Sequence, residues 1–192
     1  MRASHSFPGV LVGLALLAGC AAVPAASAAP VPSPAPVPAA ATATAGEPPC
    51  VPAQLSGRVE QDGEATGHRF ATLVVTNSSN HTCTLYGYGG AALYTASGVP
   101  IPTRMVRVGG PWPTLVTLLP GAGAGMDLHW SLVPTGDDPV EGPCQVPASE
   151  IRVIPPDGTS PFWVIWDLGP VCDGGRIEQS AYYPLTERGT AG

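Results

Sequence analysis

Lysine is absent from this sequence of 192 residues, and its basic side chains are eight arginines spread along the chain. Fourteen acidic residues bring the formal net charge to −6. A nucleic-acid backbone is bound by basic side chains that gather on one surface, and this sparse spacing provides no such group. We therefore expect no nucleic-acid partner.

C-x-x-C pairs and catalytic motifs are also absent. The widely spaced cysteines give no support for a zinc site or a thioredoxin-like redox centre. No Gly-x-Ser-x-Gly sequence marks a serine nucleophile. Beyond the N-terminal segment the histidines are His68, His81 and His129, and His129 beside Asp127 is typical of a solvated strand face. We expect no enzyme activity and no cofactor; a hydrolase whose site assembles only in the fold is the competing hypothesis.

Two groups of acidic residues are weak site candidates. Glycosidases need two carboxylates across a cleft, and Glu60, Asp62 and Glu64 lie close together, but in a glycine-containing segment that we interpret as a turn. A second group offers the hard oxygen ligands that Ca²⁺ prefers, without the regular spacing of an EF-hand loop. It consists of Asp137, Asp138 and Glu141, and we interpret it as a solvated loop with no metal.

Exposed aromatic side chains would suit carbohydrate binding, and the candidates are Trp112, Trp163, Tyr182 and Tyr183. Trp112 is the most informative because a proline on each side stiffens its glycine-rich loop. We interpret this segment as a possible recognition loop. The ordinary alternative is that the Trp112 ring caps the core of the domain.

No apolar run is long enough to cross a bilayer. Residues 9–17 form a short hydrophobic stretch behind Arg2, the pattern of a secretory signal. The stretch ends in Leu-Ala-Gly-Cys at residues 17–20, a lipobox in which the Cys20 thiol accepts a diacylglyceryl group. We predict a signal peptide over residues 1–20 and a lipid anchor on the outer face of the cell membrane. Cleavage after Ala28 would instead release a soluble secreted protein.

Residues 21–49 are rich in proline and alanine, and alternating prolines deny the backbone the donors of helix or sheet. We predict a disordered linker that lifts a domain away from the membrane. Residues 187–192 are predicted to be a disordered tail.

The remaining segment, residues 50–186, shows short strand-like runs separated by glycine and proline turns, and no sustained helical period. Residues 126–132 alternate apolar and polar side chains, as a half-buried strand does, and residues 69–77 read as a central strand. Further strands are expected at residues 55–60, 91–95, 115–119, 151–154, 162–166 and 176–183. We predict a monomeric all-β domain, an antiparallel β-sandwich that is immunoglobulin-like in general architecture.

Four cysteines remain once Cys20 is set aside, an even number that predicts two disulfides in an exported protein. A hairpin about the Asp-Gly turn at residues 157–158 brings Cys144 near Cys172. The same argument applies to the strands at residues 55 and 70. If they pair as a hairpin, extending the pairing outward places Cys50 near the turn at residues 77–80, close to Cys83. We therefore favour Cys50–Cys83 and Cys144–Cys172. The two consecutive Asn-x-Ser/Thr sequons before Cys83, at residues 77–79 and 80–82, are interpreted as a polar turn.

Three stretches together resemble a known family. They are residues 73–79 running into Cys-Thr-Leu-Tyr-Gly-Tyr at residues 83–88, the Leu-Pro-Gly turn at residues 119–121 before Leu-His-Trp at residues 128–130, and the two later cysteines. This pattern is similar to the actinobacterial secreted proteins and lipoproteins of domain of unknown function 4232. The resemblance implies a β-rich extracytoplasmic domain with two disulfides, and no activity. Glycine at position 89, where relatives tend to have proline, is a local departure.

We therefore expect a cell-envelope lipoprotein whose domain binds or scaffolds at the cell surface without catalysis. Its expected partners are the membrane, through Cys20, and a cell-wall component or protein.

Overall fold

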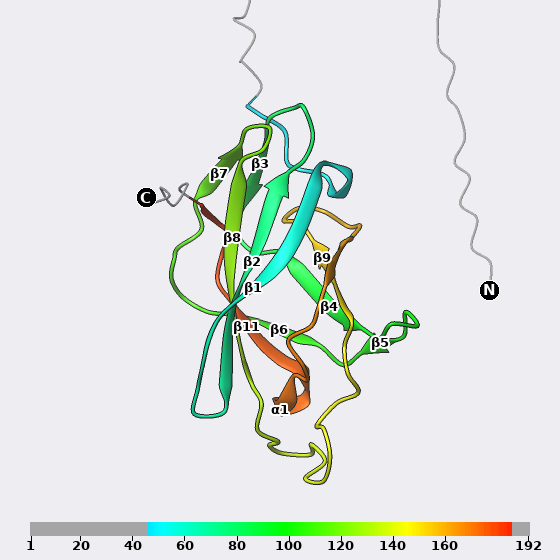
Figure 1. The fold of residues 1–192 in the computed structure, drawn as a ribbon. Coiled ribbons are helices and arrows are strands. Elements are labelled where there is room, and N and C mark those ends of the chain that lie inside the picture. The colour runs from blue at the N-terminus through cyan, green and yellow to red at the C-terminus, as the bar shows by residue number, and fades with distance from the viewer. Residues whose placement is uncertain (1–45, 186–192) are drawn as a thin grey trace, which may run out of the picture. The chain divides into compact units, whose positions relative to one another are not determined.

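A computed structural model describes residues 46–185, shown as the coloured ribbon in Figure 1. The predicted signal peptide, Cys20, most of the linker and the C-terminal tail lie outside the described residues. Among the described residues, no helix has the length and apolar character needed to span a membrane. The elements in chain order are a 3₁₀ turn (Pro52–Gln54), β1 (Leu55–Ala65), β2 (His68–Asn77), β3 (Cys83–Tyr86), β4 (Gly90–Tyr94), β5 (Pro100–Ile101), β6 (Arg104–Arg107), β7 (Leu115–Leu118), β8 (Gly123–Ser131), β9 (Glu150–Ile154), β10 (Phe162–Ile165), α1 (Cys172–Gly175), β11 (Arg176–Gln179) and β12 (Tyr183–Pro184).

The strands form three sheets. The largest has the order β1-β2-β8-β11-β6, with β12 also paired to β8, the second has the order β10-β9-β4-β5, and β3 pairs with β7. The predicted central strand is confirmed, because β2 lies between β1 and β8 and residues 71–75 are all buried. The alternation predicted for β8 is confirmed as well: Met126, Leu128 and Trp130 are buried, whereas Asp127 is exposed and His129 half-buried.

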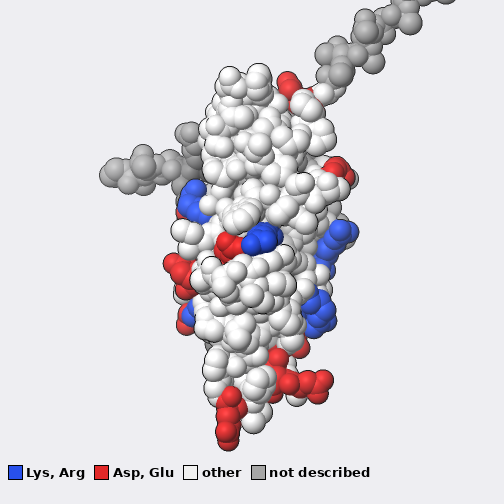
Figure 2. All heavy atoms as spheres, turned by 90° about the vertical axis from the view of Figure 1, so that its right-hand side faces the viewer, with Lys and Arg blue, Asp and Glu red and all other residues white. Residues whose placement is uncertain are grey.

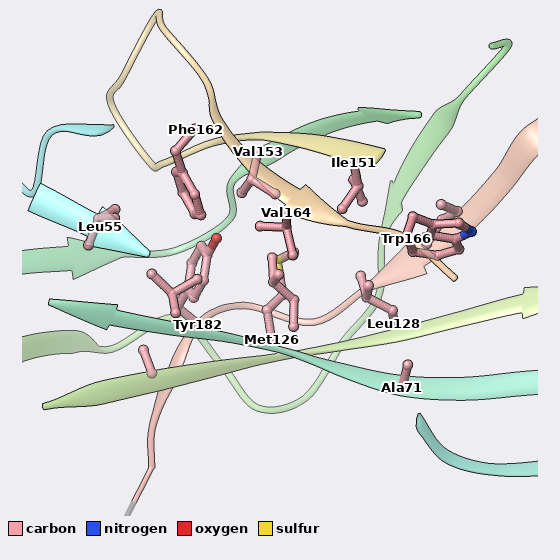
Figure 3. Close-up of a cluster of buried hydrophobic side chains, with 14 of the residues drawn as sticks. Leu55, Ala71, Met126, Leu128, Ile151, Val153, Phe162, Val164, Trp166 and Tyr182 are labelled. Atoms are coloured by element: carbon pink, nitrogen blue, oxygen red, sulfur yellow. The ribbon is translucent and has the colours of Figure 1, made fainter. Parts of the chain in front are cut away.

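The core lies between the two larger sheets, whose apolar side chains face one another in Figure 3. Met126 and Leu128 of β8 lie opposite Ile151 and Val164 of the second sheet, all nearly inaccessible to solvent. Burying each side chain of this size stabilises the fold by about 1.5–3 kcal/mol. The predicted all-β, mainly antiparallel fold is confirmed, and its sandwich-like packing follows from these facing sheets; the likeness to an immunoglobulin domain stays a prediction.

Both predicted disulfides are confirmed, Cys50–Cys83 and Cys144–Cys172. The registers behind them also agree, since Ile165 pairs with Glu150 in the β9–β10 hairpin and the first residue of β1 pairs with the last of β2. The N-terminal edge of the domain is tied to β3, because the backbone of residues 48–50 pairs with Thr84.

Three details differ from the expectation. Strand β1 continues to Ala65, so the acidic cluster at residues 60–64 lies on a strand with a bulge and not in a turn. The expected strand at residues 176–183 is divided into β11 and β12, because after Ser180 the backbone leaves β8 and Tyr182 turns into the core, where its N–H donates to the Gly87 carbonyl. Finally, β6 and β11 pair in parallel, the one parallel strand pair among the described residues.

Candidate functional site

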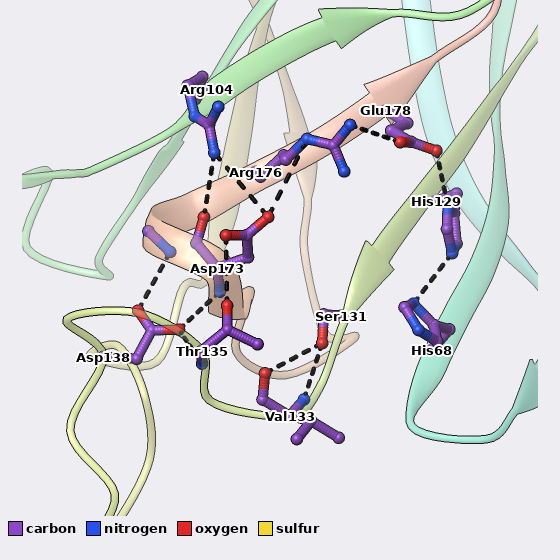
Figure 4. Close-up of polar contacts among 11 residues, drawn as sticks. His68, Arg104, His129, Ser131, Val133, Thr135, Asp138, Asp173, Arg176 and Glu178 are labelled. Carbon is purple, nitrogen blue, oxygen red and sulfur yellow. Dashed lines mark hydrogen bonds and ion pairs between the residues drawn. The ribbon is translucent and has the colours of Figure 1, made fainter.

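The outer face of the six-stranded sheet carries a connected row of polar side chains, which we call the histidine chain: Arg176, Glu178, His129 and His68 (Figure 4). Glu178 and His129 are direct partners on β11 and β8, and His68 lies at the start of the neighbouring strand β2. The Arg176 Nη2 atom lies 2.6 Å from Glu178 Oε1, and His129 Nδ1 lies 2.8 Å from Glu178 Oε2. The other ring nitrogen of His129, Nε2, lies 3.1 Å from His68 Nδ1.

The charge of Glu178 determines which nitrogen atoms of the histidine chain donate hydrogen bonds. The hydrogen bond from His129, together with the positive charge of Arg176, lowers the pKa of Glu178 below its ordinary value. An ionised carboxylate can only accept, so His129 Nδ1 is the donor and its Nε2 presents a lone pair toward His68 when the ring is neutral. Phe70 stacks on the His129 ring with centroids 4.6 Å apart. His129 and Asp127 both lie on the outward side of β8, as the alternation predicts, and the partner of His129 there is Glu178.

Asp127 instead contacts Tyr183, whose hydroxyl donates a hydrogen bond of 2.5 Å to the carboxylate. Burial, and then this bond, raise the pKa of Tyr183 to about 12, so the phenol keeps the proton that it donates. The ring lies over Gly125, where an added Cβ would come within 2.7 Å of it. On the next strand, the Thr72 hydroxyl donates to Asp62 over 2.8 Å.

The other two acids of the β1 cluster are also paired. Glu60 forms an ion pair of 2.6 Å with Arg58, and Glu64 forms one with Arg69. The same face is hollowed in several places. A depression of about 380 Å³ lies beside His68, His129 and Arg176, and an open groove of about 860 Å³ lies between Arg58 and Tyr183.

In the acidic loop between β8 and β9, Asp138 attaches the loop to α1, and the other two acids do not. The Asp138 carboxylate accepts backbone hydrogen bonds from Thr135, Asp173 and Gly174, which lower its pKa. Asp137 and Glu141 are exposed, and acidic atoms mark this end of the domain at the bottom of Figure 2. Within residues 46–185 no three metal-ligating side chains come together.

The aromatic candidates separate clearly by exposure. Trp112 is 79% exposed, so it does not cap the core; its role in recognition stays a prediction. Trp163 is 64% exposed, Tyr183 is half-buried, and Tyr182 is buried in the core. Beside the Trp112 loop, Tyr86 of β3 and Leu115 of β7 are direct partners and also exposed.

Two features escaped sequence reasoning. The histidine chain joins three strands that are far apart in the sequence, so no local spacing marks it. On the outer face of the second sheet, the Arg152 guanidinium lies 3.7 Å from the Tyr94 ring centre and 4.5 Å from that of Trp163, and it pairs with Glu150 at 2.8 Å. The alternation Glu150-x-Arg152 places both charges on one strand face, but their aromatic partners come from other strands.

Fold and surfaces together define a small disulfide-bonded all-β domain with one polar sheet face and exposed aromatic residues. The family model for the domain of unknown function named DUF4232 matches residues 50–183, and the chain belongs to this family. The resemblance noted in the sequence is therefore confirmed for the family itself. No curated protein and no solved structure matches the chain.

Proposed function

We propose that the protein is an exported lipoprotein whose β domain binds a cell-wall polysaccharide without catalysis. Two sequence features support export: the secretory pattern of residues 1–20 and the lipobox ending at Cys20. The two disulfides support the same conclusion, because such bonds form and persist in oxidising compartments outside the cytoplasm. The proposed location is the outer face of the cell membrane.

The exposure of Trp112 is the observation that carries the binding function. An exposed indole keeps a large apolar surface available for a ligand to cover, and prolines on both sides stiffen its loop in advance. The Trp112 loop passes close to the end of β3, since a Cβ added at Gly87 would lie 4.0 Å from Pro113 Cβ. The paired residues Tyr86 and Leu115 are also exposed there, and grouped exposed apolar residues mark interaction sites. Together, Trp112, Tyr86 and Leu115 form what we call the aromatic patch.

A polysaccharide fits the aromatic patch better than a charged partner does. The flat indole face packs against the C–H groups of a sugar ring, a contact that needs no charge on either side. The chain's net charge of −6 opposes binding to anionic surfaces. The proposed ligand is therefore an uncharged stretch of cell-wall glycan.

Co-sedimentation with purified cell-wall sacculi tests the binding. We expect the protein to pellet with sacculi, and Trp112→Ala to lose at least tenfold in affinity with its folding unchanged. Trp163→Ala is the matched control, because it removes an exposed tryptophan from the outer face of the second sheet. Full binding by Trp112→Ala would overturn the assignment to the aromatic patch. Release of soluble wall fragments by the protein would instead favour the hydrolase hypothesis.

Cell fractionation tests the anchor. We expect the protein in the membrane fraction, and Cys20→Ala in the culture medium or cytoplasm. Intact-mass measurement of the membrane form should show the lipid and the loss of four hydrogens from the two disulfides. Four free thiols in that material would contradict export to an oxidising space.

A further inference from the structure

His68 and His129 contact each other on the outer face of the six-stranded sheet. Two imidazole nitrogens from neighbouring strands face one another at 3.1 Å, the spacing of a hydrogen bond and also of two ligands on one metal ion (Figure 4). Each ring is anchored on a strand, since His68 pairs with Ser131 and His129 with Phe70 in the β2–β8 register. Strands hold such pairs more rigidly than loops do.

His129 is held as a metal-ligating histidine is held. Its Nδ1 donates to Glu178, and Glu178 is fixed in turn by Arg176 at 2.6 Å. Phe70 stacks on the ring and restrains its rotation. In metal sites, a carboxylate on the far nitrogen of histidine sets the tautomer, the ring direction and the basicity of the ligating nitrogen. Here the tautomer and the ring direction point the Nε2 lone pair of His129 toward His68, and the Glu178 carboxylate makes this nitrogen a stronger base.

The distance between His68 Nδ1 and His129 Nε2 also fits a shared metal ion. With metal–nitrogen bonds of about 2.0–2.1 Å, two nitrogens 3.1 Å apart subtend about 100° at the metal, close to a tetrahedral angle. His68 is exposed, so its proton can move to the solvent-facing Nε2 and leave the Nδ1 lone pair free. We propose that His68 Nδ1 and His129 Nε2 form a site for a divalent transition-metal ion such as Zn²⁺ or Cu²⁺, with Glu178 positioning His129.

The surroundings define what such a site would hold. Imidazole ligands select Zn²⁺ and Cu²⁺ over Mg²⁺ and Ca²⁺, which prefer oxygen. Since the described residues supply no third ligand of the usual kind, water completes the coordination from the adjoining depression of about 380 Å³. The positive charge of Arg176 would repel a metal ion, but two carboxylates compensate this charge. They are Glu178 at 2.6 Å and Asp173 at 4.0 Å. Two protein ligands hold a metal ion less tightly than the three or four of ordinary zinc sites, so we expect micromolar affinity.

Calorimetric titration of the purified mature protein with Zn²⁺ tests the proposal. We expect one Zn²⁺ ion to bind with micromolar affinity, and no binding of Mg²⁺. His129→Ala and His68→Ala should each weaken Zn²⁺ binding at least tenfold, and Glu178→Gln about tenfold through the lost support of His129. His81→Ala is the matched control, because His81 is an exposed histidine outside the histidine chain.

Imidazole nitrogen resonances in NMR spectra provide the second readout, which does not depend on a variant that folds. On adding Zn²⁺, those of His68 and His129 should shift while those of His81 stay in place. No Zn²⁺ binding to the wild type, or binding that His68→Ala and His129→Ala leave unchanged, would overturn the site and leave a plain hydrogen bond between the two rings. This outcome is independent of sacculus binding through Trp112.

Discussion

At the scale of single residues, Asn77 shows how one buried amide organises the end of β2. The side chain is fully buried, and its Nδ2 donates to the backbone carbonyls of His81 and Leu118 at 2.8 and 2.9 Å. Its Oδ1 accepts from the backbone N–H and the hydroxyl of Ser79. The amide therefore joins the turn before Cys83 to strand β7.

Replacing Asn77 with alanine should lower the free energy of unfolding by about 1–3 kcal/mol, because the two carbonyls lose their donor in a buried place. Urea unfolding measures the loss. Asn80→Ala, which changes the exposed asparagine of the second sequon, should stay within about 0.5 kcal/mol of the wild type. Equal effects of the two changes would show that Asn77 acts as an ordinary turn residue.

Glu178 makes stability depend on pH in a direction that its pKa sets. The hydrogen bond from His129 and the charge of Arg176 lower its pKa in the folded protein below the ordinary 4.5. Its contribution is therefore complete above the ordinary pKa and is lost as the pH falls through the lower folded value. We expect Glu178→Gln to cost about 1 kcal/mol at neutral pH, and the difference from wild type to shrink in acid. Urea unfolding at several pH values checks this, and a difference that grows in acid would contradict it.

Residue types and their alternation predicted the buried positions of β8 and both disulfide pairs. They did not predict the partners on the outer faces. His129 and Glu178 are 49 residues apart, and a strand pattern shows which side chains point outward but not which strand lies beside them. For a related reason the sequence left two interpretations of Trp112 open: proline neighbours indicate a stiff loop, whereas exposure depends on whether another element covers the ring.

At the scale of elements, the contact between β1 and β10 depends on a residue without a side chain. A Cβ added at Gly57 would lie 2.7 Å from Val164 Cγ2 and 3.0 Å from Phe162 Cε2, so the edge strands of the two larger sheets approach each other closely here. Gly63, further along β1 beside the bulge, has open space around the same position.

Gly57→Ala should destabilise the fold by about 1–3 kcal/mol, because the core must shift to admit one methyl group. Gly63→Ala should change stability by less than about 1 kcal/mol, since it adds a methyl group in open space and restricts the unfolded chain. Thermal unfolding of the two variants side by side measures the contrast. A larger loss for Gly63→Ala would contradict the close packing assigned to β1 and β10.

Hairpins could be predicted and distant pairings could not. The β9–β10 hairpin follows from turn residues next to its strands, and so does its register. The parallel pair β6–β11 joins segments about seventy residues apart with no signal of its own. The break between β11 and β12 depends on Tyr182 entering the core, which a run of strand-forming residues does not reveal.

At the scale of the whole molecule, the two disulfides close loops of similar length but hold different parts of the domain. Cys50–Cys83 spans 33 residues and ties the N-terminal edge to β3. Cys144–Cys172 spans 28 residues and ties the long connection between β8 and β9 to α1, where Asp138 makes a second attachment. A domain of this size has a modest core, so cross-links carry a large share of its stability.

Removing either pair by double Cys→Ser substitution should lower the free energy of unfolding by about 3–4 kcal/mol, because a closed loop of this length restricts the unfolded chain. The accompanying local effect should differ. Loss of Cys144 and Cys172 frees a connection without strands, so a protease should cut within residues 132–149 before the domain unfolds. Loss of Cys50 and Cys83 should instead expose cuts near β3. Urea unfolding and limited proteolysis with mass mapping distinguish the two. If a reducing agent changed neither the unfolding midpoint nor the cleavage pattern, the disulfides would not stabilise this fold, and the physical argument for an oxidising compartment would fail with them.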